Sequence, residues 1–187
     1  MGALIAAVLV GYVIGAVNPA ILIARAKGVD LRSIGSGNPG ASNAGRALGR
    51  RTGVLIAILD VAKGAVPAAC FDVVDHRAGL VAGLAAVLGH VTSPFLKGRG
   101  GKGVATAAGA VLGVHPLWVV FVIAMWVLVL VASRWIALAS ILASLSVPAV
   151  ALLADQDVWW AAVLAGIVLV RHTGNVYRRV RPTARDA

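Results

Sequence analysis

The sequence predicts an all-α integral membrane protein with about seven transmembrane helices, one of them short. Of the 187 residues, 60% are hydrophobic, and the mean hydropathy is +0.92. Several apolar runs approach the roughly 20 residues that a helix needs to cross a bilayer. A soluble domain of this length does not need so much apolar surface. We therefore expect residues 1–187 to form a single transmembrane domain.

Each predicted span is bounded by charged residues, proline or glycine, which mark helix ends. The six longer spans are residues 3–24, 53–71, 78–96, 117–133, 136–153 and 158–170. No basic region precedes the first run, and it is longer than the apolar part of a signal peptide, so we expect a retained span. Residues 104–114 form a seventh apolar piece that rises only about 17 Å, against a hydrocarbon core of about 30 Å. This piece is predicted to be a short helix.

The distribution of charge predicts how the chain is oriented. Seventeen Lys and Arg residues outweigh seven acidic ones, which gives a net charge of +10. In an apolar chain such an excess indicates membrane topology rather than nucleic-acid binding. The basic clusters lie at residues 25–51, 97–102 and 171–185, whereas aspartates populate residues 72–75 and 155–157. If residues 104–114 cross the membrane, all basic clusters are cytoplasmic, the N-terminus is outside and the C-terminus is inside.

Three polar segments interrupt the apolar chain, and buried polar groups in a membrane are costly unless they line a site. The first glycine segment, residues 35–43, contains Gly35, Ser36, Gly37, Asn38 and Asn43. Its glycines match a dinucleotide-binding pattern, but that pattern must lie between a strand and a helix of a soluble unit. Successive amides there can still bind an anion, assisted by Arg46, although a plain polar turn explains the residues equally well.

The second glycine segment, residues 100–103, directly precedes the short helix. The free amides of a helix start and the Lys102 ammonium can converge on one phosphate, with Gly101 and Gly103 allowing close approach. A Walker loop is excluded because Gly103 stands where a magnesium-binding hydroxyl is required. The alternative is a flexible basic hinge at the membrane surface.

The remaining candidates are residues with charged or basic side chains near the spans. Asp60 and Lys63 are three residues apart, so an internal ion pair is favoured over a direct catalytic role. His90 lies about two turns from the inner end of its predicted span and serves either packing or chemistry. In the third polar segment, residues 171–175, His172 and Asn175 share a helical face. The single Cys70 excludes an internal disulfide, and the histidine spacing matches no zinc site, so no metal is expected.

Taken in order, these segments resemble the bacterial acyl-phosphate-dependent glycerol-3-phosphate acyltransferase family. The resemblance rests on residues 35–46, Asp60 with Lys63, His90, residues 100–106, residues 138–140 and residues 171–175. It implies a multi-pass enzyme of the bacterial cell membrane, with its active site facing the cytoplasm and without a cofactor. Such an enzyme transfers an acyl chain from acyl phosphate to the 1-hydroxyl of glycerol 3-phosphate and releases lysophosphatidic acid and phosphate.

The resemblance also assigns roles to residues. Catalytic roles fall to Ser36, Arg46, His172 and Asn175. Substrate binding falls to Gly35, Gly37, Asn38, Asn43, Lys63, His90, Gly101, Lys102, Gly103 and Ser140. The expected partners are the two substrates and the lipid bilayer, not nucleic acid, and the expected state is a monomer. The hydroxyl proton can go to His172, to His90 or to a substrate phosphate oxygen.

Two departures from the family pattern leave alternatives open. The third segment has Gly174 where the family usually has an acidic residue, and the first span ends with Asn18 before a delayed Pro19. A divergent paralogue with altered activity is one alternative. A transporter or channel for a small phosphorylated anion is another, because broken helices with glycine-rich starts also build transport sites. That reading predicts internal repeats, which the sequence does not show.

Overall fold

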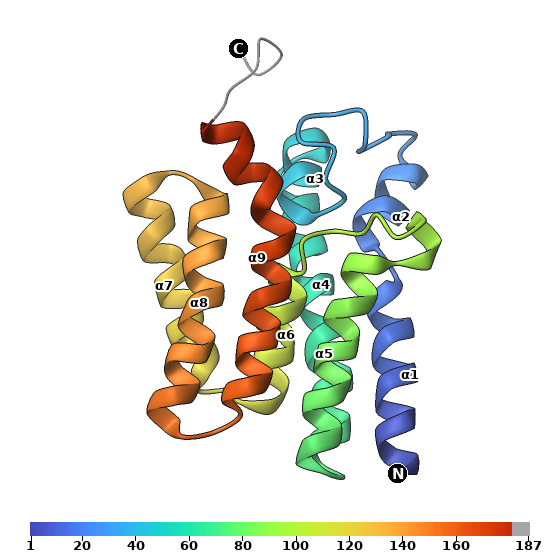
Figure 1. Ribbon diagram of the computed structural model, residues 1–187. Coiled ribbons are helices and arrows are strands. Elements are labelled where there is room, and N and C mark those ends of the chain that lie inside the picture. Colours follow the sequence, from blue (N-terminus) through green and yellow to red (C-terminus); the bar gives the residue numbers. More distant parts are fainter. Residues whose placement is uncertain (181–187) are drawn as a thin grey trace. The chain divides into compact units, whose positions relative to one another are not determined.

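A computed structural model of the chain describes residues 1–180 and is entirely helical over that range (Figure 1). This confirms the predicted all-α class. The helices are α1 (Gly2–Ala16), α2 (Pro19–Ala26), α3 (Ala41–Leu48), α4 (Arg50–Asp72), α5 (His76–Thr92), the 3-10 turn η1 (Pro94–Leu96), α6 (Val104–Val114), α7 (Trp118–Ser133), α8 (Ile136–Ala154) and α9 (Val158–Val180). The last basic residues of the predicted cytoplasmic tail, Arg181 and Arg185, lie outside the described residues.

The helices divide into two compact units. The first unit comprises Met1–Pro116 and contains α1 to α6, and the second begins at Leu117 and contains α7 to α9. In the first unit α1 packs on α5, and α4 packs on both α5 and α6. In the second unit α8 packs on both α7 and α9. The single-domain organisation of residues 1–187 stays a prediction.

Within the described residues, four helical segments are long and apolar enough to cross a membrane. They are Gly2–Ala26, Arg50–Asp72, His76–Leu96 and Ile136–Ala154, while Val104–Val114 and Trp118–Ser133 are shorter apolar helices. The predicted short helix has the predicted bounds. Helix α9 runs ten residues beyond the predicted end of its span, so the third polar segment is helical.

The first predicted span, residues 3–24, is not one helix, and the reason is local chemistry. Helix α1 ends at Ala16, and α2 begins at Pro19. Pro19 has no amide proton with which to continue the helical hydrogen bonding. Asn18 starts the new helix, because its Oδ1 accepts a hydrogen bond from the Ile21 amide at 2.9 Å. The predicted span is thus confirmed as the segment Gly2–Ala26, but it consists of two helices that meet at this break.

The third predicted span is also shorter as a helix than expected. Helix α5 ends at Thr92, because Ser93 adopts a non-helical backbone before Pro94. His90 consequently lies in the last turn of α5 and not two turns from its end. This places the histidine directly beside the segment that follows the helix.

Close backbone contacts hold the first unit together. A Cβ atom added to Gly15 of α1 would lie 2.0 Å from the Ala86 carbonyl oxygen of α5, and one added to Gly89 would lie 2.2 Å from the Tyr12 oxygen. The same closeness joins α4 to α6, where a Cβ at Gly64 would lie 2.1 Å from the Thr106 oxygen. Small residues at helix interfaces permit this approach in membranes, where packing rather than the hydrophobic effect drives association.

We expect Gly15→Ala to destabilise the protein by about 1–3 kcal/mol, because the new methyl group meets backbone that cannot rotate away. Chemical denaturation in detergent micelles, followed by circular dichroism, measures this. Gly166→Ala in α9 is the matched control, since a Cβ there meets no atom within 4 Å. Equal stability of the two variants would contradict the tight packing of α1 on α5.

Candidate functional site

The two glycine segments lie at the same end of the first unit. Figure 1 shows residues 27–40 and 97–103 at one end of this unit, with the N-terminus and the turn between α4 and α5 at the other. The Arg32 guanidinium donates a hydrogen bond to the Arg99 carbonyl oxygen, which joins the two loops directly. The structure thus brings together segments that are about 60 residues apart in the sequence.

Asn43 holds the first glycine segment in its shape. Its side-chain amide donates to the carbonyl oxygens of Leu31 and Ile34, at 3.0 Å each, and its Oδ1 accepts from the Ser36 amide at 3.1 Å. The side chain is only 1% exposed. Gly35 has a φ of +57°, and a Cβ there would lie 2.6 Å from the Asn43 oxygen. The asparagine therefore serves the loop itself, and glycine is required beside it.

Arg46 projects from a short helix that the sequence did not predict. Ser42, Asn43 and Arg46 belong to α3, whereas residues 35–43 were expected to form a loop. The guanidinium donates to Ser42 Oγ at 3.1 Å and to Asn43 Oδ1 at 3.4 Å, and the side chain is exposed. Ser36 is also exposed, and its Oγ accepts from the Asn38 amide at 3.4 Å. A fixed positive charge thus stands beside the loop amides.

A small apolar core packs against the loop that contains the first glycine segment. Leu31 is fully buried and packs with Ile21 of α2, Ala44 of α3 and Ile56 of α4. The Asn18 side chain donates to the Pro39 carbonyl oxygen at 3.1 Å, so the break in the first helix is tied to the first glycine segment. An open depression of roughly 500 Å³ lies next to this core. Its lining residues are Ile21, Arg25, Gly28, Val29, Asp30, Leu31, Arg32 and Leu96, which include none of the predicted site residues.

The second glycine segment is pressed against His90. The amides of Gly100 and Gly101 donate to the carbonyl oxygens of Val91 and His90, at 3.1 and 3.2 Å. A Cβ on Gly101 would lie 2.2 Å from Nε2 of the His90 ring. Gly103, with a φ of +81°, precedes α6 as its N-cap residue. Lys102 is half-buried at the start of this helix, where backbone amides and the helix dipole favour an anion.

A buried cluster of charged side chains from α4 and α5 lies next to the second glycine segment. The predicted ion pair is confirmed, because Lys63 Nζ lies 2.9 Å from Asp60 Oδ1 on α4. Lys63 also donates to the Val17 carbonyl oxygen at 2.8 Å, and Nδ1 of His90 lies 3.6 Å from the same Asp60 oxygen. All three side chains are at least 93% buried. The sequence did not predict the link from this pair to His90 or to Val17.

The third polar segment belongs to the second unit. His172 and Asn175 lie one turn apart on α9, as predicted. Because a carbonyl oxygen can only accept, His172 Nδ1 donates to the Val168 oxygen at 2.8 Å. Ser140 is buried on α8, where its Oγ accepts from Trp126 Nε1 at 3.3 Å. How these residues combine with the glycine segments stays a prediction.

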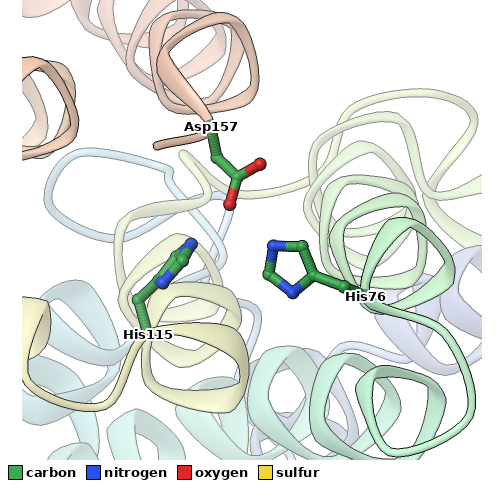
Figure 2. Close-up of side chains that lie close together, drawn as sticks. All are labelled: His76, His115 and Asp157. Atoms are coloured by element: carbon green, nitrogen blue, oxygen red, sulfur yellow. The ribbon is translucent and has the colours of Figure 1, made fainter. Parts of the chain in front are cut away.

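Two further histidines, His76 and His115, face each other at the opposite end of the first unit. The rings of His76 and His115 meet edge to face with centroids 5.5 Å apart (Figure 2). His76 Nδ1 also lies 2.7 Å from Asp72 Oδ1. Nitrogens of the two rings approach within 4.8 Å. The only sequence signal for the His76 contact is its position four residues after Asp72. These contacts involve no residue of the glycine segments.

The glycerol-3-phosphate acyltransferase family model matches residues 5–181 of the chain. The chain belongs to this family. It is 42% identical over 177 residues to the glycerol-3-phosphate acyltransferase of Geobacter sulfurreducens, covering 92% of this chain and 91% of that protein. It is 39% identical over 178 residues to the enzyme of the same name from Aquifex aeolicus, covering 91% and 92%.

Solved structures agree with this assignment. The chain is similar to the crystal structure of PlsY (YgiH), an integral membrane glycerol 3-phosphate acyltransferase, in its glycerol 3-phosphate form. The TM-score is 0.92, with 37% identity over 96% of this chain and 92% of that one. The lysophosphatidic acid form of the same protein matches with a TM-score of 0.90 and 36% identity, with the same coverage. The family fold therefore extends over nearly the whole chain.

We expect Asn43→Ala to loosen the first glycine segment of this family member, because three hydrogen bonds within the loop are lost. At about 1 kcal/mol each, partly recovered by water, the loss is about 2 kcal/mol, or a roughly thirtyfold loss of protection. Hydrogen–deuterium exchange of residues 31–40 measures it. Ser33→Ala is the control, since it removes one exposed hydrogen bond to the Asp30 oxygen in the same loop. Unchanged exchange in Asn43→Ala would contradict its anchoring role.

Proposed function

We propose that this protein transfers a fatty acyl chain from acyl phosphate to the 1-hydroxyl of glycerol 3-phosphate, giving lysophosphatidic acid and inorganic phosphate. The observation that carries the proposal is the joining of the two glycine segments, with Arg46 and Lys102, at one end of the first unit. Both substrates bring phosphate, and a site with fixed cations and few acids is suited to them. The family and the glycerol 3-phosphate form of PlsY support the same conclusion.

The two segments offer two kinds of anion contact. Lys102 and the first amides of α6 suit one phosphate, and Ser36 with Arg46 and the amides near Gly37 suits a second. Asn38, Gly101 and Gly103 are proposed to complete these contacts. Asn43 and Gly35 act chiefly by shaping the loop. The resemblance predicts substrate contacts for Lys63, His90 and Ser140 as well, but in the structure each of these side chains has a protein partner.

The proposed chemistry needs no enzyme nucleophile. The glycerol hydroxyl oxygen attacks the acyl carbonyl carbon, the bond from that carbon to the phosphate oxygen breaks, and phosphate leaves with its electron pair. Positioning and stabilisation of developing negative charge supply the acceleration, without a cofactor or metal. The proton of the hydroxyl goes to His172, to His90 or to a phosphate oxygen.

The ring of His172 has a hydrogen bond that suits it to act as a proton acceptor. Because Nδ1 donates to the Val168 oxygen, the neutral ring carries its lone pair on Nε2. This contact also orients the ring without the acidic residue that the family usually has next to Asn175. Gly174 therefore does not by itself indicate a loss of activity.

We also propose that the enzyme is a monomer in the bacterial cell membrane, with seven crossings and its active site facing the cytoplasm. The basic clusters near both glycine segments support this orientation by the positive-inside rule.

Purified protein in micelles is expected to release phosphate and form lysophosphatidic acid from palmitoyl phosphate and glycerol 3-phosphate, with or without a chelator. Release is followed by a phosphate assay and the product by mass spectrometry. Lys102→Ala is the control, because loss of a charge-assisted phosphate contact lowers kcat/KM by roughly tenfold or more. Activity only with acyl-coenzyme A, or only with added magnesium, would overturn the proposal. A fully active Lys102→Ala would remove the second segment from the binding site.

We expect His172→Ala to lower kcat by roughly a hundredfold, as loss of a general base does. Asn175→Ala is also expected to lower turnover strongly, because a positioning hydrogen bond in the proposed active centre is lost. Gly174→Glu is expected to leave turnover equal or higher, because a Cβ at this position meets no atom within 4 Å. Steady-state kinetics of the three variants measures this. Near-normal turnover in both alanine variants would show that the third segment has no catalytic part, as in a divergent paralogue.

The topology predicts that a single cysteine at Ser33 is protected from an impermeant maleimide in intact cells, whereas one at Gln156 is labelled. Both are placed in a Cys70→Ala background, and both positions are exposed in the structure. The reverse pattern would place the glycine segments outside the cell and contradict the cytoplasmic active site.

A further inference from the structure

The residues beneath the second glycine segment form a continuous series of contacts from the break in the first helix to the segment itself. Val17 has a carbonyl oxygen that lacks its helical partner, because the Ile21 amide is taken by Asn18. Lys63 donates to that oxygen at 2.8 Å and lies 2.9 Å from Asp60. The same Asp60 oxygen lies 3.6 Å from Nδ1 of His90, whose own carbonyl oxygen accepts from the Gly101 amide at 3.2 Å.

The second glycine segment packs very closely against His90. A Cβ on Gly101 would lie 2.2 Å from His90 Nε2, and one on Gly100 would lie within 2 Å of the His90 carbonyl oxygen. The second segment thus rests on both the ring and the backbone of His90. The position of that ring is therefore coupled to the position of the segment, and its Nδ1 lies 3.6 Å from the Asp60 carboxylate that pairs with Lys63.

Burying these ionisable side chains costs free energy, which indicates that they serve a function. Side chains of Asp60, Lys63 and His90 are 3%, 7% and 4% exposed. Buried ion pairs contribute little net stability compared with apolar residues of the same size, and in membranes ionisable groups usually serve function. The same break ties Asn18 to Pro39 of the first glycine segment. One cluster therefore supports both segments.

We propose that Asp60, Lys63 and His90 are positioning residues, which hold the second glycine segment in the conformation that binds the phosphate of glycerol 3-phosphate. This inference rests on the proposed function but assigns these side chains a role other than contact with substrate. If the binding conformation becomes less populated, the apparent affinity falls in proportion. Saturating substrate restores the conformation, so KM rises while kcat changes little.

The test compares Asp60→Asn with Asp72→Asn. Both remove one carboxylate from α4, but Asp72 pairs with His76 at the opposite end of the helix. Asp60→Asn is expected to raise KM for glycerol 3-phosphate by roughly 2- to 30-fold with kcat within about twofold. Asp72→Asn is expected to change neither constant. A fall in kcat with unchanged KM would overturn the proposal, since it indicates direct participation in the chemistry.

A second measurement does not depend on enzymatic activity. Trypsin cleavage of the folded protein in micelles, after Lys97, Arg99 or Lys102, reports opening of the segment and its flank. We expect Asp60→Asn to speed this cleavage, and Asp72→Asn not to. Unchanged cleavage in Asp60→Asn would overturn the positioning role even if the protein proves to have another substrate. Faster cleavage in a protein without acyltransferase activity would instead overturn the proposed function alone.

A double variant is the control for misfolding of Asp60→Asn. Asp60→Asn alone leaves the Lys63 ammonium buried without its counter-ion, whereas Asp60→Asn with Lys63→Gln removes both charges. The double variant is expected to fold and still to show the raised KM and faster cleavage, because His90 has lost its carboxylate. A double variant that behaves like the wild type in both measurements would overturn the proposal.

Discussion

The break in the first helix, between Ala16 and Pro19, is the constraint on which the first unit depends. A membrane helix that breaks exposes carbonyl oxygens that must find donors within the protein. Here Ser93 Oγ donates to the Ala16 oxygen at 2.6 Å, and Lys63 donates to the Val17 oxygen at 2.8 Å. The donors come from the end of α5 and from the middle of α4. One short irregularity thus fixes three helices relative to one another.

These contacts also determine the positions of the two glycine segments. Asn18 reaches the first segment, and the Lys63 to Asp60 to His90 series reaches the second. Tight packing of α1 on α5 and of α4 on α6 allows no sliding, since backbone meets backbone at the glycines. The loops can therefore be rich in glycine and still be ordered. Their conformation depends both on Asn43 within the first segment and on the contacts with the helices that pack against the two segments.

The sequence predicted those features that follow from local chemistry. The apolar runs, the eleven-residue helix α6, the Asp60 pair with Lys63 and the shared face of His172 and Asn175 all depend on spacing within one segment. The break at Asn18 was missed, because an apolar run that contains one proline also fits a continuous span. Helix α3 was missed, because its first residues follow directly on a glycine-rich segment that predicts a turn. The helix is stabilised by packing of Ala44 in the apolar core, which the sequence does not reveal.

Contacts between segments that are distant in the sequence could not be predicted from it. Nothing in the order of residues indicates that Lys63 reaches Val17, that His90 supports Gly101, or that Arg32 meets the Arg99 carbonyl. Such pairs are joined by loop closure and helix packing, which leave no periodic pattern in a single chain. The family resemblance proposed a group of site residues, which stays a prediction, and it could not indicate which of them belong to the glycine segments and which pack against those segments.

The pairing of Asp60 with Lys63 on a single helix has a consequence for how the chain enters the membrane. The two groups are three residues apart and meet at 2.9 Å without help from any other helix. When α4 enters the bilayer, the charge at its centre therefore already has its counter-ion on the same helix, and this buried pair is neutral as a whole. The later arrival of α5 adds His90 to a pair that already exists. Insertion of α4 thus does not require a second helix to neutralise either of these two charges.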